Sequence, residues 1–107
     1  MYSIIDIEGN GAPFRKESII EIAVYKYDGH KIIDQFISLV NPESEITPFV
    51  QKLTKIYPKM VKTAPKFHEI AKRVVEITEG TTLVGHNIDF DFRMLRQEFK
   101  TLGYEYK

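Results

Sequence analysis

The hydrophobic pattern changes period once along the chain, and this change constrains the fold more than any other feature. Residues 2–40 contain three runs rich in Ile, Val and Tyr with a period of two, which predict strands at 2–7, 18–27 and 31–40. Asp28-Gly29 separates the last two runs and is a strong hairpin signal, so we expect these strands to be antiparallel neighbours. The loop cluster at 9–13 ends the first strand.

From residue 46 onward the apolar residues follow a helical period. A short helix is expected first, broken at Pro58, with one face formed by Ile46, Val50, Leu53 and Tyr57. A longer helix follows Ala64-Pro65 and stops at Gly80, and its inner stripe contains Phe67, Ile70, Ala71, Val74, Val75 and Thr78.

A fourth strand at 81–85 and a helix at 88–102 complete the pattern. This last helix directs Phe92, Leu95 and Phe99 to the core and ends at Gly103. The alternating residues 104–106 then predict the opening of a further strand.

This order of elements predicts an α/β fold, a mixed sheet with helices on its faces, in a single domain over 1–107. The unfinished pattern at 104–106 suggests the N-terminal portion of a domain, truncated before its last strand and helices. The fourth strand would then have an exposed sheet edge, through which self-association is possible.

The composition excludes several classes of site. The 107 residues are 43% hydrophobic, enough for one core, and 15 basic residues cancel 15 acidic ones, so no long-range positive field indicates a strong nucleic-acid binder. Cysteine is absent, so a metal would be held by oxygen or imidazole. No apolar run approaches the roughly 20 residues of a membrane span. We expect no membrane partner and a cytoplasmic location.

Two acidic strings carry the candidate chemistry. Asp6 and Glu8 fall on the same face of the first strand, where two carboxylates suit Mg²⁺. The alternative is that they form the solvent-facing polar side of an edge strand. Asp91 lies in the string 86–91, in the first turns of the last helix, where it can face the first strand. Favourable interaction with the helix dipole is the alternative reading for Asp91, and Asp89 fits it better.

These strings resemble two motifs of the DEDD 3′-5′ exonuclease superfamily, in its DEDDh branch. Residues 6–11 resemble the first motif, and residues 84–91 with Leu95 resemble the second. Residues 19–23, 40–42, 53–61 and 64–67 also resemble the proofreading epsilon subunits of bacterial DNA polymerase III, in the same order. The resemblance implies a ribonuclease H-like fold and a metal-dependent exonuclease that removes nucleoside 5′-monophosphates from DNA or RNA 3′ ends.

The resemblance also implies roles for individual residues. Asp6, Glu8 and Asp91 would be the catalytic residues and the ligands of two Mg²⁺ or Mn²⁺ ions. Nucleotide-binding residues would be Gly9, Asn10, His86, Asn87 and Phe90. A single-stranded DNA or RNA 3′ end would be the partner, and a DNA polymerase is a possible second one.

Two departures from the family pattern limit the expected activity. Gly9-Asn10 stands where the family commonly has Thr-Thr, which loosens the expected grip on the terminal nucleotide. The family's third motif, a His followed five residues later by an Asp, has no match after Asp91. His86 and Asp91 have this spacing, but both belong to the second motif. His30 and His68 are expected to face solvent.

Three hypotheses follow. The first is a 3′-5′ exonuclease whose isolated 107-residue chain is weak or inactive. The second is a non-catalytic exonuclease-like module that binds nucleic-acid ends or a polymerase partner. A small ribonuclease acting on short oligonucleotides shares the mechanism of the first, and these residues do not separate the two.

Overall fold

The computed structural model describes residues 1–13 and 15–106. Its elements follow the predicted order of three strands, helices, a strand and a helix. Along the chain they are β1 (Tyr2–Gly9), β2 (Ile19–Tyr27), β3 (Ile32–Leu39), α1 (Pro48–Thr54), α2 (Pro58–Val61), α3 (Phe67–Thr78), β4 (Thr82–Val84) and α4 (Ile88–Thr101). None of the helices among the described residues has both the length and the apolar character of a membrane span.

The strands form one mixed sheet, as the sequence predicted, and their order in it is β3-β2-β1-β4. β1 pairs antiparallel with β2, β2 pairs antiparallel with β3, and the expected hairpin joins the latter two. β4 runs parallel to β1, and their pairing ends at Ile4 and Val84. The hydrogen-bonded pairing of the two parallel strands therefore ends before Asp6.

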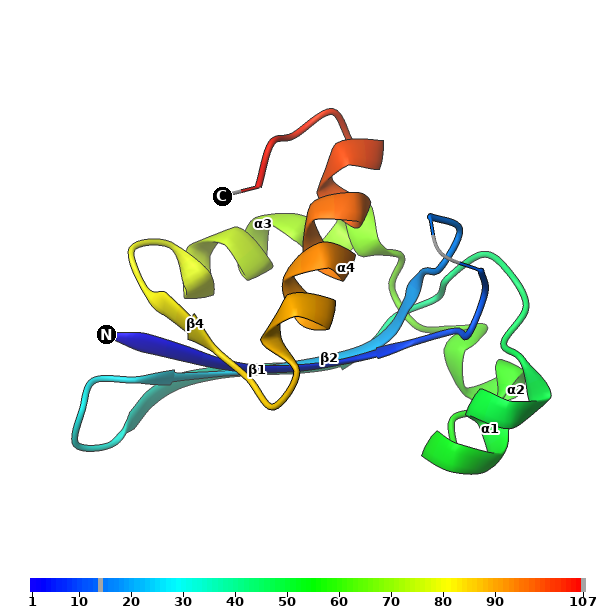
Figure 1. Cartoon of the computed structure of the whole chain (residues 1–107), viewed down its shortest axis with the longest axis horizontal. Helices are drawn as coiled ribbons and strands as arrows, with labels where there is room; N and C mark the ends of the chain where they lie inside the picture. Colours follow the sequence, from blue (N-terminus) through cyan, green and yellow to red (C-terminus); the bar gives the residue numbers. More distant parts are fainter. Residues whose placement is uncertain (14, 107) are drawn as a thin grey trace.

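Helices α3 and α4 cover one face of this sheet, and α1 and α2 lie beyond one end of it (Figure 1). Alternation along β1 buries Ser3, Ile5 and Ile7 beneath the helices and leaves Tyr2 and Ile4 exposed on the other side. The predicted inner residues of α3 and α4 are buried or partly buried in this core, which also contains Ile77 and Met94. The sheet thus has one packed face and one open face.

The short helix expected after residue 46 is α1, and a second short helix, α2, follows it. Thr47 caps α1 by accepting a hydrogen bond from the Val50 N–H, and Pro58 begins α2 instead of only ending a helix. A proline fits the first turn because its φ is already helical and it lacks an N–H to satisfy. The expected apolar face was wrong for Leu53 and Tyr57, which are 68% and 43% exposed. A second small core instead contains Ile20, Ile46, Ile56 and Val61.

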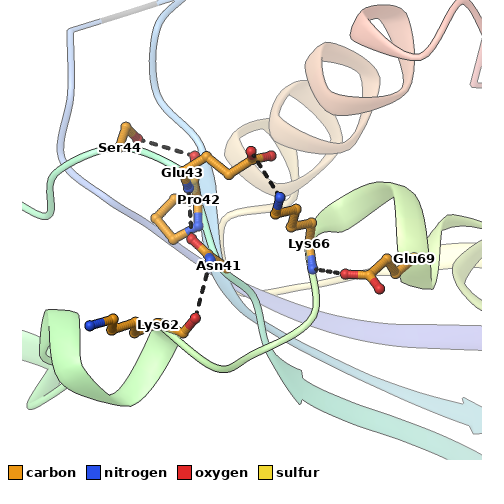
Figure 2. A network of polar contacts seen from close by, with 7 residues as sticks. All are labelled: Asn41, Pro42, Glu43, Ser44, Lys62, Lys66 and Glu69. Carbon is orange, nitrogen blue, oxygen red and sulfur yellow. Dashed lines mark hydrogen bonds and ion pairs between the residues drawn. The ribbon is translucent and has the colours of Figure 1, made fainter.

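A polar network joins the loop after β3 to the start of α3 (Figure 2). The Asn41 N–H donates to the Pro65 carbonyl at 2.8 Å, and the Asn41 side-chain amide donates to the Lys62 carbonyl at 3.4 Å. Lys66 and Glu43 form an ion pair at 3.4 Å, but both side chains are about half exposed, so it contributes little. The backbone bond of Asn41 is therefore the firmer link between these segments.

The expected strand at 104–106 was wrong, because this segment folds back over the helices as a loop. The Tyr106 ring stacks on Phe99 with centroids 4.8 Å apart, and its hydroxyl donates to the Thr78 Oγ1 at 2.7 Å. Alternating Tyr-Glu-Tyr indicates a strand only if a neighbouring strand is available. Here the apolar surface of α3 and α4 takes the aromatic ring instead.

Candidate active site

Asp6 and Glu8 lie side by side on the open face of the sheet, as predicted from the alternation of β1. Asp6 is exposed and Glu8 is partly buried. The register of β1 against β2 shifts between Glu8 and Gly9, which marks a bulge at this point. Bulges bend a strand and redirect its side chains, and they are common next to active sites.

Asp91 comes from α4, which packs on the covered face of the sheet, and it reaches the edge of β1. It is only 3% exposed, and its Oδ1 accepts a hydrogen bond from the Ile7 N–H at 3.2 Å. This N–H is available because β4 has already separated from β1. The expectation that Asp91 faces the first strand is confirmed, whereas Asp89 is exposed in the same helical turn.

Gly85 makes room for the Asp91 carboxyl group. A Cβ atom at Gly85 would lie 2.9 Å from the Asp91 Oδ2 and 3.0 Å from the Ile5 carbonyl oxygen. Both distances are shorter than ordinary contacts, and neither atom lies at the end of a long flexible side chain. A residue without a side chain at position 85 therefore allows Asp91 to approach β1.

The three carboxyl groups influence one another electrostatically. Burial raises the pKa of Asp91 to about 6, the Ile7 N–H opposes this rise, and the charge of Asp6 adds to it. The pKa of Glu8 is also raised, first by burial and then by the charges of Asp6, Glu21 and Asp91. A bound cation would favour the ionised form of both groups, so the site has the electrostatics of a cation site.

The loop after β1 is organised by Asn10, which is fully buried. Its Oδ1 accepts hydrogen bonds from the N–H groups of Ala12 and Ser18, and its Nδ2 donates to the Ser44 hydroxyl and the Glu45 carbonyl. The Asn10 side chain is thus engaged within the protein. These bonds shape the loop that follows Gly9.

The remaining candidates for nucleotide contact lie at the start of α4. His86 and Asn87 are exposed, and the Asn87 carbonyl accepts hydrogen bonds from the N–H groups of Phe90 and Asp91. Phe90 is partly buried, and the guanidinium carbon of Arg93 lies 5.3 Å from its ring centroid. His86 and Asn87 are therefore free to meet a ligand, while Phe90 mainly supports the helix.

The carboxylates provide the right donor type for Mg²⁺ or Mn²⁺, which prefer oxygen ligands. Within residues 1–13 and 15–106, however, no three His, Asp or Glu side chains come close enough together to hold a metal ion. Asp6 and Glu8 project from the open face and Asp91 arrives beside the strand edge. The site is suited to a cation in the chemistry and charge of its groups.

Two residues that belong to this site were not identified as such from the sequence. Glu21 lies directly opposite Glu8 in the register of β1 and β2 and raises its pKa. The sequence did not identify it, because the register of β1 against β2 was not predicted. Gly85 lies within the segment 84–91 that resembles the second motif, but its close approach to Ile5 and Asp91 arises across the fold and is not visible in the sequence.

The sequence profile of the RNase_T family, described as exonuclease, matches residues 3–107. The chain belongs to this exonuclease family. Among curated relatives, the "3'-5' exonuclease DinG" of Staphylococcus saprophyticus is 34% identical over 106 residues, and that of Staphylococcus aureus is 31% identical over the same length. Each alignment covers 99% of the chain but only 12% of the relative.

Solved exonuclease structures share the fold. Exonuclease X in complex with 5′ overhanging duplex DNA is 31% identical, with a TM-score of 0.71. The match covers 89% of this chain and 54% of the exonuclease X chain. Apo exonuclease I is 19% identical but has a TM-score of 0.86, covering 97% of the chain and 25% of its own. The nuclease domain of 3'hExo, a DEDDh family member bound to rAMP, has a TM-score of 0.74 at 24% identity, covering 99% of the chain and 61% of its own. The fold is the ribonuclease H-like one that the resemblance implied, and the DEDD superfamily is confirmed.

Proposed function

We propose that this chain forms part of a metal-dependent 3′-5′ exonuclease that removes nucleoside 5′-monophosphates from the 3′ ends of DNA or RNA single strands. The observation that carries the proposal is that Asp6 and Glu8 on β1 and Asp91, hydrogen-bonded to the same strand, all lie beyond the end of the β1–β4 pairing, where burial and mutual repulsion raise the pKa of Glu8 and Asp91. Active sites of α/β proteins form at such strand ends, where neighbouring connections diverge.

Asp6, Glu8 and Asp91 would hold two Mg²⁺ or Mn²⁺ ions. When bound, these ions supply positive charge that activates the attacking water and stabilises the leaving 3′-oxygen. The Ile7 N–H already holds the Asp91 carboxyl group in place, so this side chain loses little conformational entropy when a cation binds. The exposed His86 and Asn87 and the loop at Gly9 line the approach of the terminal nucleotide.

The test uses 5′-labelled single strands with Mg²⁺ or Mn²⁺, incubated with the longest natural protein that contains these residues. We expect shortening from the 3′ end, and Asp6→Asn should abolish it. The matched control is Asp34→Asn, which changes a carboxylate of β3 that pairs with Arg73 at 2.7 Å. An inactive parent, or an Asp6→Asn variant as active as the parent, would contradict the proposal.

The 107-residue chain alone should be much slower than the complete enzyme. Its sequence provides no histidine after Asp91 to act as the general base of the third motif. Loss of a general base typically costs a factor of about 10² to 10⁴ in rate. Turnover of the isolated chain at a rate equal to that of the parent would show that the base lies within these residues.

A second candidate is a non-catalytic module that binds nucleic-acid ends or a polymerase partner. The absence of three closely gathered ligands within the described residues favours it. Calorimetric titration with Mn²⁺ separates the two candidates. A catalytic site should bind the ion, and the Asp6→Asn variant should no longer bind it. No heat of binding in the parent would favour the module.

A further inference from the structure

A groove of about 1090 Å³ runs along the solvent side of α4, outside the carboxylate site. Its walls come from α4, from the segment 103–106 and from Arg15 in the loop before β2. The lining includes four cationic residues, Arg15, Arg93, Arg96 and Lys100, against two acidic ones, Asp89 and Glu105. Arg93 also lies 3.8 Å from a Glu17 carboxylate oxygen, which compensates part of this charge. The excess that is left is positive, in a chain that has no net charge.

Helical geometry places the charged residues of α4 in a row. Asp89, Arg93, Arg96 and Lys100 are spaced by four, three and four residues, so they share one face. At 1.5 Å per residue, this row is about 16 Å long. The row begins at Asp89 in the first turn of α4, the end of the helix that also carries Asp91, and it leads away from that end.

Aromatic residues line the groove together with these cations. The groove is lined by Phe92, Tyr104 and Tyr106, and the guanidinium carbon of Arg96 lies 5.6 Å from the Phe92 ring centroid. A guanidinium placed over a ring loses little entropy on binding and keeps its N–H groups available for phosphate oxygens. Tyr104 is 48% exposed and offers a ring face to the groove.

We propose that this groove binds the sugar-phosphate backbone of a nucleic-acid single strand, on the 5′ side of the terminal nucleotide. A row of cations with interleaved aromatic rings is the combination by which proteins bind single strands without sequence preference. The inference rests on the proposed function for its direction along the strand. Asp89 and Glu105 moderate the attraction, which suits an enzyme that must release and advance its substrate.

The experiment measures binding of a fluorescent 15-nucleotide oligothymidylate by anisotropy, in EDTA and over a range of salt concentrations. The variant is Arg96→Ala/Lys100→Ala, in which both changed residues are exposed. We expect affinity to fall about tenfold and the slope of log affinity against log salt to fall by about 1.4, corresponding to two lost phosphate contacts. Arg96→Lys with Lys100 intact should recover most of the salt slope.

The matched control is Lys52→Ala/Lys59→Ala, which removes two exposed cations from α1 and α2. It should bind as the parent does. Equal affinity and salt slope in the groove variant and the parent, with the fold intact by circular dichroism, would overturn the proposal. An equal loss in the control variant would also overturn it, because binding would then follow total charge.

Failure of the proposed function can be recognised separately. The groove variant should still bind Mn²⁺ in calorimetry, and Asp6→Asn should still bind the strand in EDTA. A chain that binds the strand through the groove but binds no metal contradicts the exonuclease and supports the groove. A chain that binds metal but binds the strand equally well with and without the groove substitutions supports the exonuclease and contradicts the groove.

Discussion

Glu98 shows how one partly buried carboxyl group links the stability of this fold to pH. It accepts a hydrogen bond from the Ile19 N–H at 2.9 Å, which ties α4 to the start of β2. Burial raises its pKa above the ordinary 4.5, the Ile19 N–H opposes the rise, and the charge of Glu43 adds to it. The folded protein therefore binds this proton more readily than the unfolded chain does.

We predict that Glu98→Gln stabilises the protein at neutral pH. With a raised pKa, the contribution of Glu98 is fully present below about pH 4.5 and is lost as the pH rises through the folded-state value. Glutamine keeps an acceptor for the Ile19 N–H and carries no charge. A gain of about 1 kcal/mol would raise Tm by about 4–8 °C.

Thermal unfolding in EDTA at pH 4 and pH 7.5 tests this prediction. The gain should appear at the higher pH and vanish at the lower one. Glu98→Ala is the comparison, because it removes the acceptor and should destabilise the protein at both pH values. A gain of equal size at both pH values would contradict the role of ionisation.

Gly85→Ala tests the positioning of Asp91. The added methyl group would contact the Asp91 Oδ2 and the Ile5 carbonyl too closely, so the carboxyl group should move away from β1. We predict Mn²⁺ affinity at least tenfold weaker by calorimetry, the effect typical of losing a group that orients a ligand. Gly80→Ala is the control: Gly80 has φ +71° and open space around it, so this change should lower stability by about 1 kcal/mol and leave Mn²⁺ binding unchanged.

At the scale of elements, the predictions were best where partners are close in sequence. The β2–β3 hairpin was found because Asp28-Gly29 and the flanking alternation are local signals. The positions of Asp6 and Glu8 on one face followed from the same period of two. The sequence could not show that Asn10 is fully buried, because it is satisfied by Ser18 and by Ser44, 8 and 34 residues away.

The prediction of a strand at 104–106 was wrong for a related reason. Its pattern is that of a strand, but the ring of Tyr106 finds a better partner in Phe99, and its hydroxyl finds one in Thr78. Local propensity is a weak guide when one aromatic side chain can bury its surface on a neighbouring helix pair. The segment therefore acts as a strap across α3 and α4.

We predict that this strap contributes measurably to stability. Tyr106→Phe removes the hydrogen bond to Thr78 and should cost about 1 kcal/mol. Tyr106→Ala also removes the stacked ring and should cost about 3 kcal/mol. Glu105→Ala is the control. Glu105 is exposed and adjacent to Tyr106, so this change should have little effect on stability. Urea denaturation measures all three, and an Ala variant no less stable than the Phe variant would show that the ring packing is not needed.

At the scale of the whole molecule, the sheet has two free edges among the described residues. The expected one is β4, with three residues, and the other is β3, with eight. An unpaired edge offers backbone donors and acceptors to a second copy, and a longer edge offers more of them. Ile32, Ile33 and Ile37 on β3 are 45%, 42% and 52% exposed, so this edge also presents apolar surface.

We predict that the chain self-associates at high concentration and that β3 contributes more to this than β4. Sedimentation velocity over a concentration series should show a rising sedimentation coefficient for the parent. Ile37→Lys should reduce the rise because a lysine on an edge strand opposes pairing, whereas Val84→Lys on β4 should reduce it less. A monomer at all concentrations would contradict the prediction, and a stronger effect of Val84→Lys would assign the contact to β4, the edge that the sequence alone indicated.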